Sequence, residues 1–213
     1  MESEIIKERE ELASLLMELS AELGTPEYVQ EKHRYEWETD EERIAIRLPY
    51  DLMLDANGQP EWDRVFHYVL CIVQSSMATV GLFHGKDCLA HKVFTAYMVR
   101  KKQGVSQIKH LKTKGKSRAG SRIRLASGLE FFEGINGRLQ NHFEAFEIER
   151  IAFSCSKILL PHFYGAKVMP PFDKKDLRLL PIPRHIEKPT HEEMMRAHRF
   201  LTYAELTRQE IHL

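Results

Sequence analysis

The chain has 213 residues, 43% of them hydrophobic and 29% charged, which predicts one compact domain with a buried core and excludes collagen-like, disordered and disulfide-scaffold proteins. No apolar run approaches the roughly 18 residues that a membrane-spanning helix needs, and the acidic start lacks the basic and then apolar pattern of a secretion signal. The 31 basic and 31 acidic side chains balance, which excludes a uniformly basic nucleic-acid-binding protein.

The first half of the chain alternates between helical and extended patterns. Apolar residues recur at helical spacing up to Gly24, and Ile44 and Ile46 alternate with their neighbours as in a strand. Pro60 favours the start of a second helix, because the apolar residues that follow it recur at i, i+3, i+4 and i+7. The expected elements are a helix over residues 3–23, a polar connector over 25–42, a strand over 44–48, a turn over 55–58 and a helix over 60–73.

The second half of the chain contains the clearest turn and capping patterns. The segment His84-Gly-Lys-Asp87 predicts a hairpin between two strands. Ser117 can cap a long helix, and Thr190 with Glu193 fits a capping box at the start of the last helix. The expected elements are strands over 77–84 and 88–100, a mobile loop over 101–116, a helix from 117, a strand over 151–155, an irregular segment over 161–173, a strand over 177–182 and a helix over 191–205.

These elements predict an α/β fold. We expect a single domain with a mixed central β-sheet flanked by helices, preceded by an N-terminal helix. In this division, residues 1–40 form an acidic helix and a connector, and residues 41–213 form the catalytic domain.

Metal and redox chemistry find little support in the residue pattern. Cys71, Cys88 and Cys155 are far apart and odd in number, which indicates reduced thiols in a cytoplasmic protein and excludes a zinc site built from cysteine pairs. The 11 histidines include no pair with clear ligand spacing, and no carboxylate cluster would hold magnesium. We therefore expect neither a metal nor a cofactor.

The zero net charge conceals two regions of opposite sign. Residues 1–64 carry 7 basic and 18 acidic side chains, a balance of −11. Residues 88–129 carry 11 basic side chains and no acidic one. A stretch of 42 residues without a carboxylate favours a polyanionic partner over an ordinary solvated face, and we expect the acidic third to face away from RNA.

The basic stretch places an uncharged polar loop between two groups of cations. Gln107 lies in this loop, and its amide can position a water molecule or donate to a developing oxyanion, although it cannot act as a strong base. The flanking cations can grip phosphates through a salt-sensitive attraction. The candidate RNA-binding residues are Arg100, Lys101, Lys102, Lys109, Lys112, Lys114, Lys116, Arg118, Arg122 and Arg124.

Two runs of this stretch resemble the release-factor-like domain of ribosome-quality-control proteins. The first extends from His91 to Gln107, and the second is Ser117-Arg-Ala-Gly-Ser121. This domain occurs in the ankyrin-repeat and zinc-finger peptidyl-tRNA release factors and is related to domain 2 of archaeo-eukaryotic class I release factors. The resemblance continues through Asp176–Pro183 and Lys188–Glu193, and the short chain suggests a stand-alone bacterial form.

The resemblance implies release of a nascent chain from peptidyl-tRNA on a stalled large ribosomal subunit. The implied partners are that subunit, its ribosomal RNA and peptidyl-tRNA, with no membrane involved. Class I release factors carry Gly-Gly-Gln, and the matching segment here is Gly104-Val-Ser-Gln107. The resemblance thus implies Gln107 as the catalytic residue, with Gly104 and Ser106 in the same loop. Val105 and Ser106 depart from the glycine-rich pattern, and they resist backbone conformations that glycine permits.

Three functions remain open. Ester hydrolysis is favoured, because an ester is an easy substrate once water is positioned and the oxyanion is stabilised. The second is endonucleolytic removal of the 3′ CCA end of the tRNA, which would gain from a general base such as His91 or His110. The third is a non-catalytic module that binds the ribosome or tRNA.

Overall fold

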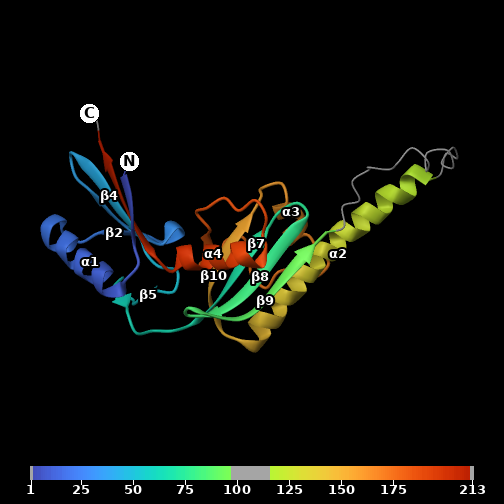
Figure 1. The fold of residues 1–213 in the computed structure, drawn as a ribbon, viewed down its shortest axis with the longest axis horizontal. Helices are drawn as coiled ribbons and strands as arrows, with labels where there is room; N and C mark the ends of the chain where they lie inside the picture. The colour runs from blue at the N-terminus through green and yellow to red at the C-terminus, as the bar shows by residue number, and fades with distance from the viewer. Residues whose placement is uncertain (1, 97–115, 212–213) are drawn as a thin grey trace.

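The computed structural model describes residues 2–96 and 116–211, with the backbone alone for Glu2 and for residues 116–127. Over these ranges the chain forms two five-stranded sheets, a two-stranded hairpin of β5 (Met53–Leu54) and β6 (Pro60–Glu61), and four α-helices. Figure 1 shows the two sheets side by side along the long axis of the molecule, with both termini at one end. None of the described helices is long and apolar enough to cross a membrane.

The first sheet, here called the central sheet, has the strand order β11-β10-β7-β8-β9. Strand β10 pairs in parallel with β7 and β11, whereas β7, β8 and β9 pair antiparallel. The sheet is therefore mixed, and the prediction of an α/β fold with a mixed central sheet is confirmed. Its strands are β7 (His67–Val73), β8 (Met77–His84), β9 (Asp87–Thr95), β10 (Ile148–Cys155) and β11 (Leu179–Pro181).

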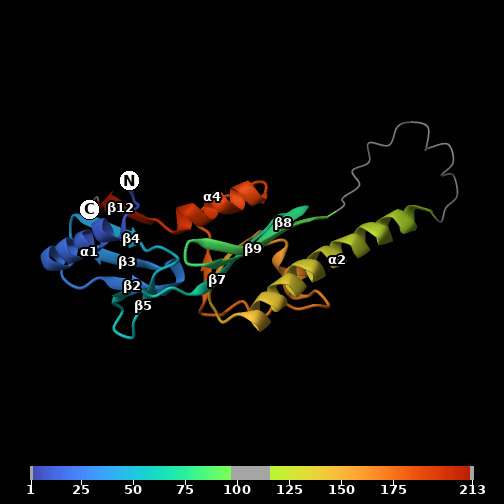
Figure 2. The same ribbon diagram turned by 60° about the horizontal axis from the view of Figure 1, so that its bottom comes forward.

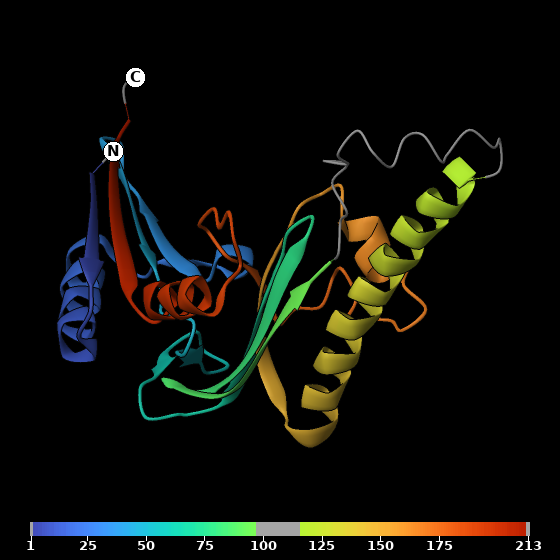
Figure 3. The ribbon, with the colours of Figure 1, turned by 45° about the vertical axis from the view of Figure 1, so that its right-hand side comes forward.

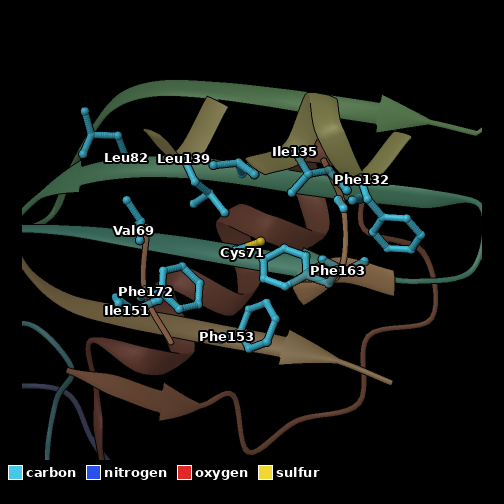
Figure 4. Packing of buried hydrophobic residues seen from close by; sticks show 14 of the residues in the cluster. Val69, Cys71, Leu82, Phe132, Ile135, Leu139, Ile151, Phe153, Phe163 and Phe172 are labelled. Atoms are coloured by element: carbon cyan, nitrogen blue, oxygen red, sulfur yellow. The ribbon is translucent and has the colours of Figure 1, made fainter. Parts of the chain in front are cut away.

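Helices cover both faces of the central sheet. In β7, Val69 and Cys71 face a core made with α2 (Lys116–Ala145) and α3 (Leu160–Tyr164), as Figure 4 shows. Tyr68 and Leu70 of the same strand face a second core made with α4 (His191–Leu201). Because successive side chains of a strand point to opposite faces, this strand is buried on both sides, and Figure 3 shows α2 and α4 on opposite sides of the sheet.

The second sheet, here called the terminal sheet, joins both ends of the chain. Its strand order is β1-β12-β4-β3-β2, and all neighbours are antiparallel. Helix α1 (Arg9–Leu23) packs on one face, against a core that includes Trp37 and Ile46 (Figure 2). The strands are β1 (Glu2–Ile6), β2 (Glu27–Val29), β3 (Arg34–Glu38), β4 (Glu42–Arg47) and β12 (Ala204–Glu210), with a 3-10 turn η1 (Gln30–Lys32) between β2 and β3.

Several sequence-based predictions are wrong. Residues 25–42 are not a connector, because they contain β2, η1 and β3, and β3 pairs with β4 across the expected boundary at residue 40. Residues 60–73 are not a helix, because 67–73 form strand β7, which is buried on both faces. A run that is apolar at almost every position also has apolar residues at the helical spacing, so this spacing does not distinguish a helix from a strand. Helix α4 ends at Leu201, and the expected helix to 205 gives way to β12.

A buried arginine links the two sheets. Arg150 of β10 is 6% exposed, and its Nη1 donates to the backbone carbonyls of Tyr50 and Leu52 at 2.7 and 2.8 Å. The Tyr50 hydroxyl in turn donates to the carbonyl of Pro181 at 2.6 Å. Arg150 Nη1 also lies 3.1 Å from Nε2 of the buried His33, and burial together with the Arg150 charge holds the pKa of His33 well below its usual value.

Candidate functional site

The predicted catalytic loop lies outside the described residues. This applies to Gly104, Ser106 and Gln107 and to six of the ten predicted RNA-binding cations, Arg100, Lys101, Lys102, Lys109, Lys112 and Lys114. The other four, Lys116, Arg118, Arg122 and Arg124, lie on the first turns of α2, where the backbone alone is described. Their roles stay predictions, and the structure bears on the elements at the two ends of the loop.

Strand β9 holds the start of the loop. It is an edge strand of the central sheet, and beyond its last residue the amide of Ala96 donates to the carbonyl of Ser76 at 2.9 Å. Phe94 packs into the core under α2, close to Gly134, where an added Cβ would lie 3.4 Å from the Phe94 ring. The described chain is thus fixed by packing and hydrogen bonding up to Ala96, its last described residue before the loop.

Helix α2 holds the other end of the loop. Its C-terminal half packs on the central sheet through buried residues at helical spacing, including Phe132, Ile135 and Leu139. Its first turns extend beyond the sheet, away from the rest of the molecule (Figures 1 and 3). The backbone of these turns can therefore carry basic side chains away from the body of the protein.

A buried amide fixes α2 against the segment that follows α3. Asn136 is fully buried, and its Nδ2 donates to the carbonyls of Phe163 and Val168, both at 2.8 Å. One turn later, Gln140 Nε2 donates to the carbonyl of Met169 at 2.8 Å. These bonds set the position of α2 and so of the helix end that follows the loop. The sequence pattern did not reveal Asn136, because a single polar residue in a long helix has no local signature.

The opposite side of β9 contacts the start of α4. His91, which opens the motif run, stacks on His191 with ring centroids 3.9 Å apart. Thr190 caps α4 by accepting a hydrogen bond from the backbone amide of Glu193 at 3.2 Å, which confirms the predicted N-cap. His91 therefore has a packing role in the described structure.

The other described histidines and the three cysteines show no reactive arrangement. Among the described residues, no group of three or more His, Cys, Asp or Glu side chains could hold a metal ion. The three cysteines are free, and burial raises the pKa of Cys155 to about 12 and that of Cys71 well above its usual value. Both thiols therefore stay protonated at neutral pH and are poor nucleophiles. His67 stacks on His84 with ring centroids 4.5 Å apart.

Comparisons with known proteins identify relatives of this chain. The family model described as Bacteroidetes VLRF1 release factor matches residues 68–209, from β7 to β12 and including the loop between β9 and α2. The chain is 25% identical over 150 residues to the tRNA endonuclease ANKZF1 of Mus musculus, covering 68% of this chain and 19% of the mouse protein. The chain thus spans about a fifth of the length of this relative. Among solved structures, the Vms1 mitochondrial localization core aligns with 12% identity and a TM-score of 0.43, covering 93% of this chain and 83% of that one.

Proposed function

The chain belongs to the Bacteroidetes VLRF1 release factor family, and from this membership we propose that it frees nascent chains from peptidyl-tRNA on stalled ribosomes or large ribosomal subunits. The family match confirms the resemblance to release factors that residues 91–107 carry. The observation that carries the proposal is the segment Gly104-Val-Ser-Gln107, which lies inside the matched residues and in the middle of the carboxylate-free stretch. The proposed substrate and partners place the activity in the cytoplasm.

The proposed reaction is hydrolysis of the ester between the peptide and the tRNA. The Gln107 amide oxygen orients a water molecule, and its NH₂ group donates to the oxyanion that forms when water adds to the ester carbonyl. The bond from that carbon to the ribose oxygen then breaks, the ribose oxygen takes up a proton, and the peptide leaves as a carboxylate. Because Gln107 cannot take the proton, ribosomal or tRNA groups must pass it on.

The scaffold supports this assignment through the elements at both ends of the loop. Strand β9 is hydrogen-bonded up to Ala96, and the C-terminal half of α2 is fixed by Asn136, so the elements that flank the loop are anchored to the central sheet. The basic side chains on either side of Gln107 supply the attraction for phosphates, and in our proposal they guide the loop into the RNA-lined active centre.

The second candidate is cleavage of the tRNA near its 3′ end. The observation that favours it is the similarity to the mouse protein named a tRNA endonuclease. That reaction would use the 2′-hydroxyl next to the broken phosphodiester and would gain from a general base. Of the two bases considered, His91 stacks on His191, and His110 lies outside the described residues.

A product analysis distinguishes the candidates. Stalled complexes of the large subunit with labelled peptidyl-tRNA are mixed with excess protein in a single turnover, and both the peptide and the tRNA end are analysed. Free peptide with an intact CCA end supports ester hydrolysis, and a shortened tRNA would assign the nuclease instead. Binding of the protein to the complex without either product would support the third function, a non-catalytic module that binds the ribosome or tRNA.

The residue assignment needs a matched control from the same loop. We expect Gln107→Ala to slow release by about 100-fold or more while leaving ribosome binding intact, as expected for loss of a transition-state donor. Gln103→Ala removes the same side chain four residues earlier, and we expect it to stay within a few-fold of the wild type. Equal release by the wild type and Gln107→Ala would contradict the catalytic role of Gln107.

A further inference from the structure

The terminal sheet has one face that α1 does not cover. In β3 and β4, Tyr35, Trp37 and Ile46 point toward α1, so Arg34 and Arg47, which alternate with them, point away. On this open face, Arg34 pairs in register with Arg47, and Arg47 pairs with Glu205 of β12. Helix α1 therefore lies on one side of the sheet and these arginines lie on the other.

A furrow runs from this open face to the edge of the central sheet. A cavity of about 190 Å³ is lined by Lys32, Arg34, Arg47, Thr207 and Pro181, among others. A second cavity of about 720 Å³ shares Lys32 and Pro181 with it and adds Lys174 and Lys175. The shared residues show that the two cavities adjoin each other beside β11, and together they are here called the furrow.

The furrow carries an excess of positive charge after its ion pairs are counted. Arg34 is paired with Glu36, the Glu205 carboxylate is paired with Arg47 at 3.3 Å, and Asp176 is paired with Arg178 at 2.7 Å. Lys32, Lys174 and Lys175 have no carboxylate within ion-pair distance in the described parts of the chain, and Glu31 is the one acidic lining residue outside these pairs. The Lys174 Nζ also lies 5.3 Å from the centroid of the Tyr164 ring, so among the described residues Lys32 and Lys175 are the lining lysines without an ion-pair or ring contact, against one unpaired carboxylate.

Arg47 provides a rigid floor at one end of the furrow. Its side chain is 8% exposed, and its guanidinium packs over the Phe200 ring at 4.6 Å from the centroid. Its Nη2 donates to the carbonyl of Phe200 at 3.2 Å, while its Nη1 is buried and has no hydrogen-bond partner among the described groups. Because Nη1 is buried and the charge is paired with Glu205, Arg47 forms part of the floor and does not bind an anion directly.

We propose that this furrow binds the sugar–phosphate backbone of RNA, as a second contact separate from the Gln107 loop. Lys32, Arg34 and Arg47 belong to the acidic third, so in this proposal one face of that third contacts RNA, in contrast to the expectation from its net charge. Unpaired lysines spread along an open furrow suit a chain of phosphates, and the prolines at its wall offer apolar surface to the sugars. The terminal sheet and the first turns of α2 lie toward opposite ends of the long axis of the molecule (Figures 1 and 2), so a single large RNA assembly would be held at two separated places. The choice of RNA as the polyanion rests on the proposed function.

The test is the salt dependence of binding to an unacylated tRNA, measured with the full-length protein and without any release reaction. The furrow variant combines Lys32→Ala, Lys174→Ala and Lys175→Ala. A control variant removes the same amount of charge from exposed positions outside the furrow, with Lys7→Ala, Arg43→Ala and Arg196→Ala. Both variants must show the wild-type circular dichroism spectrum before they are compared.

Each phosphate contact contributes about 0.7 to 0.9 to the slope of log K against log salt concentration. We therefore expect the furrow variant to reduce the magnitude of this slope by about 2, and the control variant to leave it within about 0.5 of the wild type. Equal slopes for the two variants would overturn the inference. Stronger competition by polyglutamate than by tRNA would also overturn it and assign an acidic protein partner, and full displacement of tRNA by millimolar inorganic phosphate would assign a small-anion site.

Failure of this inference is distinguishable from failure of the proposed function. Gln107→Ala is expected to abolish release and to keep the wild-type salt slope, because it removes no charge. The furrow variant is expected to weaken binding of the tRNA while its release rate at saturating protein stays near the wild-type value.

Discussion

Replacing Asn136 with leucine tests whether one buried amide holds α2 in place. Leucine has a similar volume but cannot donate to the carbonyls of Phe163 and Val168, which the structure leaves with no other partner among the described hydrogen bonds. A buried carbonyl without a partner costs about 1 to 3 kcal/mol, and the Val168 carbonyl is only part-buried, so the gross loss is about 2 to 4 kcal/mol. Part of this is offset, because Asn136 Oδ1 is itself buried without a partner and is removed. We expect a net loss of about 2 kcal/mol in the free energy of unfolding.

The assay is urea denaturation at neutral pH, with Gln140→Leu as the matched control. Gln140 makes a single bond of the same length to Met169, at an exposed position, and its replacement should change the free energy of unfolding by no more than about 0.5 kcal/mol. If Asn136→Leu costs no more than Gln140→Leu, the amide does not hold α2 and the reasoning is refuted. Below the unfolding transition, we also expect slower peptide release by Asn136→Leu if the proposed function holds, because α2 follows the proposed catalytic loop.

A charged variant at the same position gives an independent pH test. In Asn136→Asp, the carboxylate would face two carbonyl oxygens in a buried site, so its folded-state pKa would be raised above the unfolded value. The variant would therefore be most stable at acidic pH, below the unfolded pKa, and would lose stability as the pH rises through the folded pKa. Stability that is independent of pH relative to the wild type would contradict this account.

Three further predictions concern packing, pH and charge. Gly81→Ala places a Cβ at 2.7 Å from Met194 Sδ, and we expect a loss of about 1 to 3 kcal/mol in the free energy of unfolding; wild-type stability would contradict it. Burial lowers the folded-state pKa of His142 to about 4. Its contribution to the free energy of unfolding is therefore present above the unfolded pKa and is lost as the pH falls from about 6.5 to 4. In denaturation measurements, His142→Asn should reduce the dependence of stability on pH over that range. The third variant combines Glu10→Gln, Glu18→Gln and Glu22→Gln, which neutralises exposed glutamates of α1. We expect it to raise nonspecific RNA affinity without unfolding the terminal sheet. Unchanged affinity in a filter-binding assay would refute the idea that the acidic third limits nonspecific RNA binding.

The role of the acidic residues has to be tested by substitution and not by deletion, because the same segment forms strands of the terminal sheet. Deleting residues 1–40 would remove β1, β2 and β3 and expose the core under α1. A change in RNA binding after that deletion would report unfolding as well as charge.

Local features of this protein were readable from its sequence. The N-cap at Thr190, the hairpin at 84–87 and the long helix after the loop depend on residues a few positions apart, and the structure has all three. The release-factor family was also readable, because its motif is a continuous run of residues. The mixed central sheet followed from the alternation of strands and helices.

Only the tertiary structure decided how distant segments pair and which faces are buried. Strand β12 was missed because its pairing with β1 and β4 joins the two ends of the chain, and β7 was mistaken for a helix because burial on both faces removes the alternation that marks a strand. The furrow likewise combines Lys32 with Lys174 and Lys175, which are far apart in the sequence. A capping residue or a turn is determined by its neighbours, whereas pairing and burial depend on contacts that form only when the whole chain folds.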